Sequence, residues 1–323
     1  MPAPMRPRVA LLAAVLALLV AGCGGGGSSE TRPVTVALDF TPNGVHAGIY
    51  AAVAKGFDKK HGVKLVIRQP SASTDSLKLL AAGRADLAIV DIHDLGLAHE
   101  KGADIVGVGA LVNRPLAAVI AQQSVARPRD LEGKRVGVTG LPSDVAVLKS
   151  MVRSDGGTYA RVKTITIGFS AVPDLIAKKV DAATAFWNAE GVTLQQRGVP
   201  VRIFRADEFG APHYPELVIA TKRSTLDKDP DLIKRALAAL GDGSNAARRN
   251  PNVALQPLVQ ASGADPSLIR AELKAVQPIL SPDVRLDPPS LAAWSAWATR
   301  FGILQARPKV SDLFALGLTA RGT

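Results

Sequence analysis

Short runs of β-branched and apolar residues alternate with helical segments along most of the chain. Residues 34–38 and 63–67 are predicted strands on either side of a predicted helix over about 46–60. A predicted helix over 77–83, ended by a glycine, and a predicted strand over 85–90 follow. This order indicates a βαβαβ unit, whose parallel strands need right-handed helical crossovers.

The same alternation begins again further along the chain. A strand over 134–138, a Gly-Leu-Pro-Ser turn and a helix over 144–153 are followed by a strand over 162–167, a helix over 171–179 and a strand over 182–186. Helical segments occupy the stretch from residue 231 to the end. Two α/β lobes are therefore predicted, with the last helices packed on one of them. Ligands of such sheets bind outside the carboxyl ends of the strands.

The first residues are typical of a secretion signal. Arg6 and Arg8 precede an apolar run over 9–20 that is too short for a stable membrane span. The run closes on Leu-Val-Ala-Gly-Cys, which resembles the bacterial lipobox, so we expect residues 1–22 to be removed and Cys23 to carry a lipid. Residues 23–33, rich in glycine, would form a tether. The alternative is an ordinary secretory signal with a cysteine just past the cleavage point.

Charge and composition change this picture little. The formal net charge of +11 and the pI near 9.9 are compatible with a nucleic-acid-binding surface. The basic residues are scattered, however, and aromatic residues make up only 4% of the chain, so a solvated basic surface is the preferred interpretation. A single cysteine also rules out an internal disulfide.

The loop after the first predicted strand holds candidate ligand-binding residues. It leads into the first helix, where free backbone N–H groups favour a polar or anionic group. Phe40 could stack on a flat ligand, while Asn43 and His46 could hydrogen-bond it. The alternative is a Pro-Asn-Gly turn that only starts the helix.

Two further loops carry polar groups directly after a predicted strand. Asp91 and His93, with Asp94, could be an acid/base set or metal ligands, although no other His or Cys has the spacing of a structural zinc site. Ser143 lies in the glycine-containing turn 140–144, which is a weak anion-binding signal. Helix capping is the alternative for both loops.

A fourth segment, over 186–192, places a scarce tryptophan at a strand end. Trp187 could be a stacking plate, with Asn188 and Glu190 as polar readers of a heteroaromatic ring. Burial of Trp187 in the core is the alternative. The sequence has no nucleophile elbow, Walker loop, dinucleotide fingerprint or His-Glu-x-x-His helix, so catalysis has no positive support.

These loops carry a resemblance to a known family. The motif from Leu38 to Asn43, its continuation over 46–57, and the segments 83–89 and 131–137 resemble the alkanesulfonate and thiamine-precursor class of ABC-transporter substrate-binding proteins. The segments 186–191 and 209–217 look most like members that bind thiamine pyrimidine precursors. The family usually has Trp at the position of Phe40, so the stacking face is smaller here.

The resemblance implies an α/β, two-lobed periplasmic-binding-protein fold of type II, in which each lobe is a mostly parallel sheet flanked by helices. Residues 34–117 and 215–323 would form one lobe and 118–214 the other, with two hinge crossings. The first lobe would present Asp39, Phe40, Asn43, His46, Asp91 and His93, and the second Ser143, Trp187, Asn188 and Glu190, with Tyr214 at the returning hinge.

The implied function is that of an extracytoplasmic, lipid-anchored component of an ABC importer, monomeric and not an enzyme. It would close around an aminopyrimidine and pass it to a permease, without a cofactor, metal or nucleic acid. The ring would stack on Phe40 and Trp187, and its amine would bind Glu190 or Asp39. Binding of riboflavin, a sulfonate or nitrate is the alternative, as is a pyrimidine synthase of the same fold.

Overall fold

The computed structural model describes residues 31–72 and 75–319, and the chain from Thr31 onwards forms one compact unit. The predicted signal over 1–22 and Cys23 lie outside the described residues, as does most of the predicted tether. The first strand begins at Arg32, so the end of that tether belongs to the fold. No helix within the described residues has the length and apolar character needed to cross a membrane.

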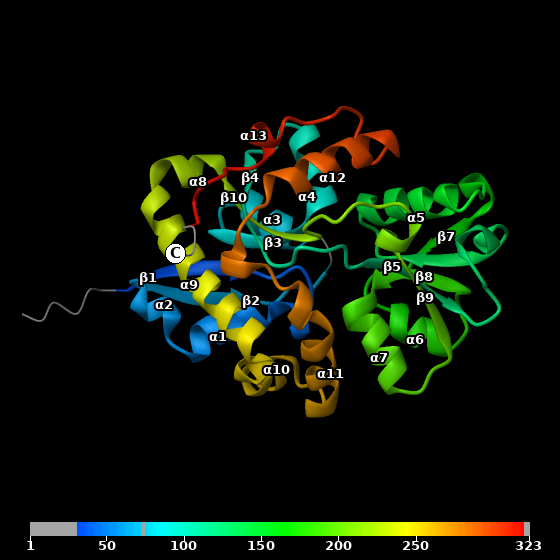
Figure 1. The fold of residues 1–323 in the computed structure, drawn as a ribbon, viewed down its shortest axis with the longest axis horizontal. Helices are drawn as coiled ribbons and strands as arrows, with labels where there is room; N and C mark the ends of the chain where they lie inside the picture. Colours follow the sequence, from blue (N-terminus) through cyan, green and yellow to red (C-terminus); the bar gives the residue numbers. More distant parts are fainter. Residues whose placement is uncertain (1–30, 73–74, 320–323) are drawn as a thin grey trace, which may run out of the picture. The chain divides into compact units, whose positions relative to one another are not determined.

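Two five-stranded sheets form the framework (Figure 1). The first sheet has the order β2-β1-β3-β10-β4, in which β1 is parallel to β2 and β3 while β10 is antiparallel to β3 and β4. Its strands are β1 (Arg32–Ala37), β2 (Val63–Arg68), β3 (Leu87–Asp91), β4 (Ile105–Ala110) and β10 (Leu217–Lys222). Four of its strands therefore share one direction, and β10 alone opposes them.

The second sheet repeats this plan in the order β7-β6-β8-β5-β9. Here β6 is parallel to β7 and β8, and β5 is antiparallel to β8 and β9. Its strands are β5 (Ala117–Gln122), β6 (Arg135–Val138), β7 (Lys163–Thr166), β8 (Ala182–Phe186) and β9 (Val201–Arg205). The opposed strand of each sheet is the one that follows a chain crossing, so the crossings lie within 111–116 and 206–216. The predicted two lobes, each with a mostly parallel sheet, are confirmed.

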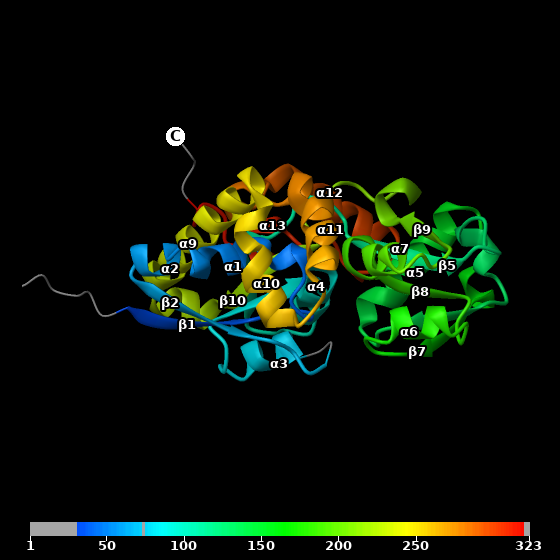
Figure 2. The ribbon, with the colours of Figure 1, turned by 90° about the horizontal axis from the view of Figure 1, so that it is seen from below.

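Helices cover both sheets (Figures 1 and 2). The first lobe carries α1 (Ala47–Ala54), α2 (Phe57–Lys60), α3 (Asp75–Ala81), α4 (Ile92–Glu100), α8 (Arg223–Lys228), α9 (Pro230–Arg249), α10 (Leu255–Ser262), α11 (Pro266–Val276), α12 (Pro288–Arg300) and α13 (Val310–Leu313). The second lobe carries α5 (Pro142–Ser154), α6 (Ala171–Ile176) and α7 (Val192–Gln196). The helix predicted over 46–60 is divided at Gly56, whose φ of 68° is left-handed and interrupts the helix.

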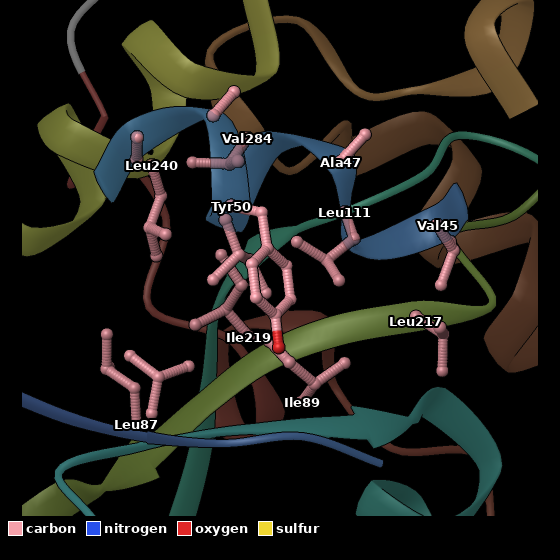
Figure 3. Close-up of a cluster of buried hydrophobic side chains, with 14 of the residues drawn as sticks. Val45, Ala47, Tyr50, Leu87, Ile89, Leu111, Leu217, Ile219, Leu240 and Val284 are labelled. Carbon is pink, nitrogen blue, oxygen red and sulfur yellow. The ribbon is translucent and has the colours of Figure 1, made fainter. Parts of the chain in front are cut away.

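Successive residues of the central strands point alternately into two separate hydrophobic cores. Leu87 and Ile89 of β3 join the cluster on one face of the first sheet, where Tyr50 is also buried (Figure 3). Ala88 and Val90 point the other way, into a cluster that includes the side chains of α12. This period of two is the one expected of a strand that is buried on both faces. The last helices pack on both faces, with α9 against α1 and α12 on the opposite side.

Candidate functional site

A cavity of about 90 Å³ lies between the two lobes and is lined by residues of both. Its lining includes five carboxyl groups and three phenylalanine rings, and no Lys, Arg or His of the described residues takes part. The carboxyl groups belong to Asp39, Asp91, Asp94, Asp144 and Glu190, and the rings to Phe40, Phe169 and Phe186. The cavity therefore combines flat apolar surface with a strongly acidic polar lining.

Strand ends build this cavity. Asp39 follows β1, Asp91 ends β3, Thr139 follows β6 and Phe186 ends β8. These strands are parallel within their sheets, so their carboxyl ends meet at one edge, where ligands of α/β sheets bind. The sequence motifs at the strand ends converge for this reason.

Asp39 is held by a histidine that does not itself line the cavity. Nδ1 of His46 accepts the backbone N–H of Asn43 over 3.3 Å, which places the ring hydrogen on Nε2. That N–H donates to Oδ1 of Asp39 over 3.0 Å. The Asn43 side chain caps the following turn by accepting the backbone N–H of Val45. His46 and Asn43 are both buried, so they position Asp39 from behind.

A hydrogen bond between the lobes closes one side of the cavity. Oγ of Ser143 in α5 donates to Oδ2 of Asp94 in α4 over 3.0 Å, and both residues are buried. Burial raises the pKa of Asp94 to about 7 against the opposing effect of this bond. Burial likewise raises the pKa of Asp144 to about 6, although Thr139 hydrogen-bonds it.

Glu190 lies on one π-helical turn, Trp187–Gly191, directly after β8. Such turns are rare and occur often at functional sites, because they redirect side chains within a helical segment. The backbone N–H of Phe186 donates to the carboxyl group of Glu190 over 3.1 Å. Burial raises the pKa of Glu190 to about 7 and outweighs this bond. The carboxyl group is therefore able to donate or accept a proton near neutral pH.

The rings at the cavity are not the expected pair. Phe40 of the first lobe meets Phe169 of the second edge-on, with ring centroids 4.5 Å apart at 76°. Trp187 does not line the cavity: its indole N–H donates to the carbonyl of Pro115 over 3.0 Å, and the Arg205 guanidinium stacks over its ring at 4.2 Å. The structure thus brings Phe169, rather than Trp187, against Phe40.

Three other predicted residues lie behind the cavity. His93, Tyr214 and Asn188 are fully buried and are not among the lining residues. The Nε2 of His93 lies 3.0 Å from the Tyr214 hydroxyl, and burial lowers the pKa of His93 to about 3. Neither side-chain amide atom of Asn188 has a hydrogen-bond partner among the described residues.

Of the eleven predicted ligand-binding residues, the cavity is lined by Asp39, Phe40, Asp91, Ser143 and Glu190. Sequence reasoning did not select Asp94, Asp144, Phe169 and Phe186 as ligand-binding, although they line it too. A signal existed for each: Asp94 and Asp144 belong to the loops already singled out, Phe186 ends a predicted strand, and Phe169 follows another. Applying the strand-end rule to every strand would have found them.

Comparison with known proteins places the chain in context. The profile of the family described as NMT1/THI5 like matches residues 43–254. The chain is 31% identical to the formylaminopyrimidine-binding protein of Halalkalibacterium halodurans over 257 residues, which cover 78% of this chain and 77% of that protein. It is 27% identical to the 4-amino-5-hydroxymethyl-2-methylpyrimidine phosphate synthase of Legionella pneumophila subsp. pneumophila over 241 residues. These cover 72% of this chain and 75% of that protein.

The fold is shared with binding proteins of known structure. The alkanesulfonate-binding protein of Xanthomonas axonopodis pv. citri, bound to MOPS, superposes with a TM-score of 0.71 at 18% identity, covering 89% of this chain and 99% of that one. The likeness shows the two-lobed periplasmic-binding-protein fold that was predicted. The family resemblance predicted from the loop motifs is confirmed by the profile match.

Proposed function

We propose that this chain, which belongs to the NMT1/THI5-like family, is the extracytoplasmic solute-binding component of an ABC importer and captures an aminopyrimidine precursor of thiamine between its two lobes. The observation that carries the proposal is the lining of the interlobe cavity. Five carboxyl groups and three phenylalanine rings meet there, with no basic side chain among the described lining residues.

An acidic lining selects for a ligand that donates hydrogen bonds or carries positive charge. A sulfonate or nitrate needs Arg, Lys or bare helix N-termini, and these carboxyl groups would repel it. An aminopyrimidine presents an exocyclic amine as donor beside a ring nitrogen as acceptor. A protonated carboxyl group matches that edge with one acceptor and one O–H donor, and an ionised one matches the ring-protonated form.

Glu190 and Asp94 are suited to bind either protonation form of an aminopyrimidine. The pKa of each carboxyl group is raised to about 7 by burial, so both protonation forms are accessible at neutral pH. Phe40 and Phe169 supply the apolar surface for the ring. Glu190 lies in the second lobe and Asp39 in the first, so a ligand that contacts both stabilises the closed arrangement of the lobes.

The cavity is compact, at about 90 Å³. A single substituted ring needs much less space than a tricyclic flavin with its ribityl chain, so riboflavin is the weaker candidate ligand.

The proposed role in an importer rests on the fold together with the N-terminal motif. We infer that Cys23 carries the lipid that anchors a monomer to the outer face of the membrane, where it meets its permease. The wild type should incorporate a labelled fatty acid in producing cells, and a Cys23→Ala variant should not. Equal labelling of the two proteins would contradict lipid anchoring, but not ligand capture.

The ligand is tested by calorimetry and thermal shift on purified protein with 4-amino-5-hydroxymethyl-2-methylpyrimidine, its formylamino analogue, riboflavin, taurine and MOPS. A native ligand at 100 times its Kd should add about 2.7 kcal/mol to the free energy of unfolding. Binding confined to the pyrimidines supports the proposal, and binding only of a sulfonate or flavin contradicts it. Turnover of a bound pyrimidine would favour an enzyme.

Two substitutions test the polar contacts. Glu190→Gln and Asp39→Asn are expected to weaken pyrimidine binding roughly tenfold or more each, because each removes a hydrogen bond to a charged or ionisable group. Glu208→Gln is the matched control, since Glu208 is exposed and does not line the cavity. Unchanged affinity in both cavity variants would exclude these contacts.

A further inference from the structure

Glu216 connects the two chain crossings. Its Oε2 accepts the backbone N–H groups of Leu116 and Ala117 over 2.8 and 2.9 Å, where the first crossing enters β5. Glu216 is itself the last residue of the second crossing, immediately before β10, and its side chain is fully buried. Two backbone donors on one carboxyl oxygen favour the ionised form of Glu216.

Asp91 lies between this buried carboxyl group and the cavity. Asp91 is opposite Leu217 in the pairing of β3 with β10, and the backbone N–H of Ile92 donates to the carbonyl of Glu216 over 2.9 Å. Side-chain ligand atoms of Asp91, His93 and Glu216 all lie within 4.8 Å of one another. Because Asp91 also lines the cavity, it lies next to both the cavity and Glu216, which connects the chain crossings.

Among the described residues, His93 and Tyr214 lie next to this pair, and neither side chain is charged. Trp294 donates its indole N–H to Nδ1 of His93 over 2.9 Å, so the ring hydrogen of His93 is on Nε2 and the imidazole is neutral. A metal ion at Nε2 would need that hydrogen moved to Nδ1, against the indole N–H. Burial and the charge of Glu216 raise the pKa of Tyr214 well above its usual range, so its phenol is also neutral.

Two adjacent carboxylates in such a site cannot both be ionised without strong repulsion. Burial first, and then the charges of Glu216, Asp94 and Asp144, raise the pKa of Asp91 well above its ordinary value. Burial raises the pKa of Glu216 to about 7, against the two backbone hydrogen bonds that lower it. Glu216 accepts two backbone N–H groups, whereas Asp91 accepts one, from His93 over 2.7 Å, so the negative charge is better stabilised on Glu216. The proton therefore belongs on Asp91, which is partly exposed and lines the cavity.

We propose that Asp91 and Glu216 share one proton carried by Asp91, and that Glu216 is a positioning residue that fixes Asp91 as a neutral acid facing the ligand. The O–H of Asp91 then donates to Glu216. The acceptor lone pairs that remain on Asp91 are available to an amino group in the cavity. The part that concerns the ligand rests on the proposed function, whereas the shared proton does not.

Infrared spectroscopy of the unliganded protein tests the shared proton directly. At pH 7 the C=O stretching band of protonated carboxyl groups should lose the intensity of one group in Asp91→Asn and no more in the double variant, because the pair holds one proton. Glu272→Gln is the matched control: Glu272 is buried elsewhere, so its loss should add to that of Asp91→Asn. No loss in Asp91→Asn, or a double variant that loses twice the intensity of Asp91→Asn, would overturn the proposal.

The pH profile of pyrimidine affinity tests the role of Glu216. The change in affinity caused by ionisation of Asp91 should vanish in Asp91→Asn. In Glu216→Gln it should move to lower pH by at least about one unit, because a neighbouring negative charge raises a carboxyl pKa by such amounts. Steps from Asp94, Asp144 and Glu190 should stay in both variants. A profile that Glu216→Gln leaves unmoved would contradict positioning. If the wild type binds no pyrimidine, the proposed function fails while the infrared result still decides the shared proton.

Discussion

The indole N–H of Trp294 donates to Nδ1 of His93 over 2.9 Å, and this contact joins residues 201 positions apart. Because Nδ1 is an acceptor, we expect ¹⁵N NMR to show His93 as the neutral Nε2–H tautomer. Burial lowers the pKa of His93 to about 3, so its two ring nitrogens should keep the ¹⁵N shifts of a neutral imidazole between pH 5 and 8. A histidine peptide, with an ordinary pKa near 6.5, is the reference. A titration of His93 in that range would contradict the tautomer.

Removing this donor should cost stability. Trp294→Phe leaves Nδ1 of His93 buried without a partner, and we expect the free energy of unfolding in urea to fall by about 1–3 kcal/mol plus the cost of the smaller ring. Trp297→Phe is the matched control. Trp297 is buried beside His93 on the same helix, but its indole N–H has no partner among the described residues. Equal losses in the two variants would show that the hydrogen bond contributes nothing.

The contact between α1 and α9 depends on a glycine. A Cβ at Gly243 would lie 2.1 Å from the carbonyl oxygen of Gly48 and 2.8 Å from the backbone nitrogen of Ala52. Gly243→Ala is expected to destabilise the protein by about 1–3 kcal/mol, because backbone atoms cannot move aside as side chains do. Gly96→Ala in α4 is the control, since its nearest neighbours are side-chain atoms of Leu304 and Trp294 at 3.0 and 3.1 Å and not backbone atoms. We expect Gly96→Ala to be better tolerated in the same urea titration.

Glu272 should make stability fall as pH rises. Burial raises its pKa to about 8 in the folded protein, above the ordinary value near 4.5. Below pH 4.5 both states are protonated; between about 4.5 and 8 only the unfolded state releases the proton, which favours unfolding. Glu272→Gln should therefore stabilise the protein by about 2–4 kcal/mol at pH 8 and by little at pH 4. Its Oε1 can still accept the backbone N–H of Gly44, which now donates over 3.0 Å.

Denaturation of wild type and variant at both pH values measures this difference. Glu208→Gln, at an exposed position, should change stability at neither pH. A Glu272→Gln variant that is no more stable than the wild type at pH 8 would show that the carboxyl group is not held protonated by the fold.

Phe169 should control how long a ligand stays bound. Its ring centroid lies 4.5 Å from that of Phe40 of the other lobe, and both rings line the cavity, so we expect a bound ligand to contact both. Phe169→Ala is expected to raise the dissociation rate of a pyrimidine about tenfold, and Phe169→Leu less, because leucine retains apolar contact. Stopped-flow displacement measures both rates. Equal rates in wild type and Phe169→Ala would exclude this role.

The local sequence pattern alone was sufficient to predict the strands and the edge of the sheets where the cavity forms. Residues 63–67 and 182–186 were predicted as strands, and they lie within β2 and β8. Asp39 and Asp91 follow or end strands that are parallel, and the geometry of parallel strands brings such positions together whatever the rest of the chain does. The turn at Gly56, in contrast, was hidden by helical periodicity on both sides of it.

Contacts between distant segments settled which of the selected side chains reach the cavity. Trp187 is held outside the cavity by a hydrogen bond to the carbonyl of Pro115, in the first chain crossing, and by the guanidinium of Arg205, directly before the second. His93 is enclosed by tryptophans of α12, a helix whose packing the sequence motifs did not predict. A strand or loop pattern records only the propensities of neighbouring residues, whereas these orientations depend on which distant groups offer a hydrogen bond or a ring face. The acidic character of the cavity arises in the same way, because five carboxyl groups from four separate segments in the two lobes come together there.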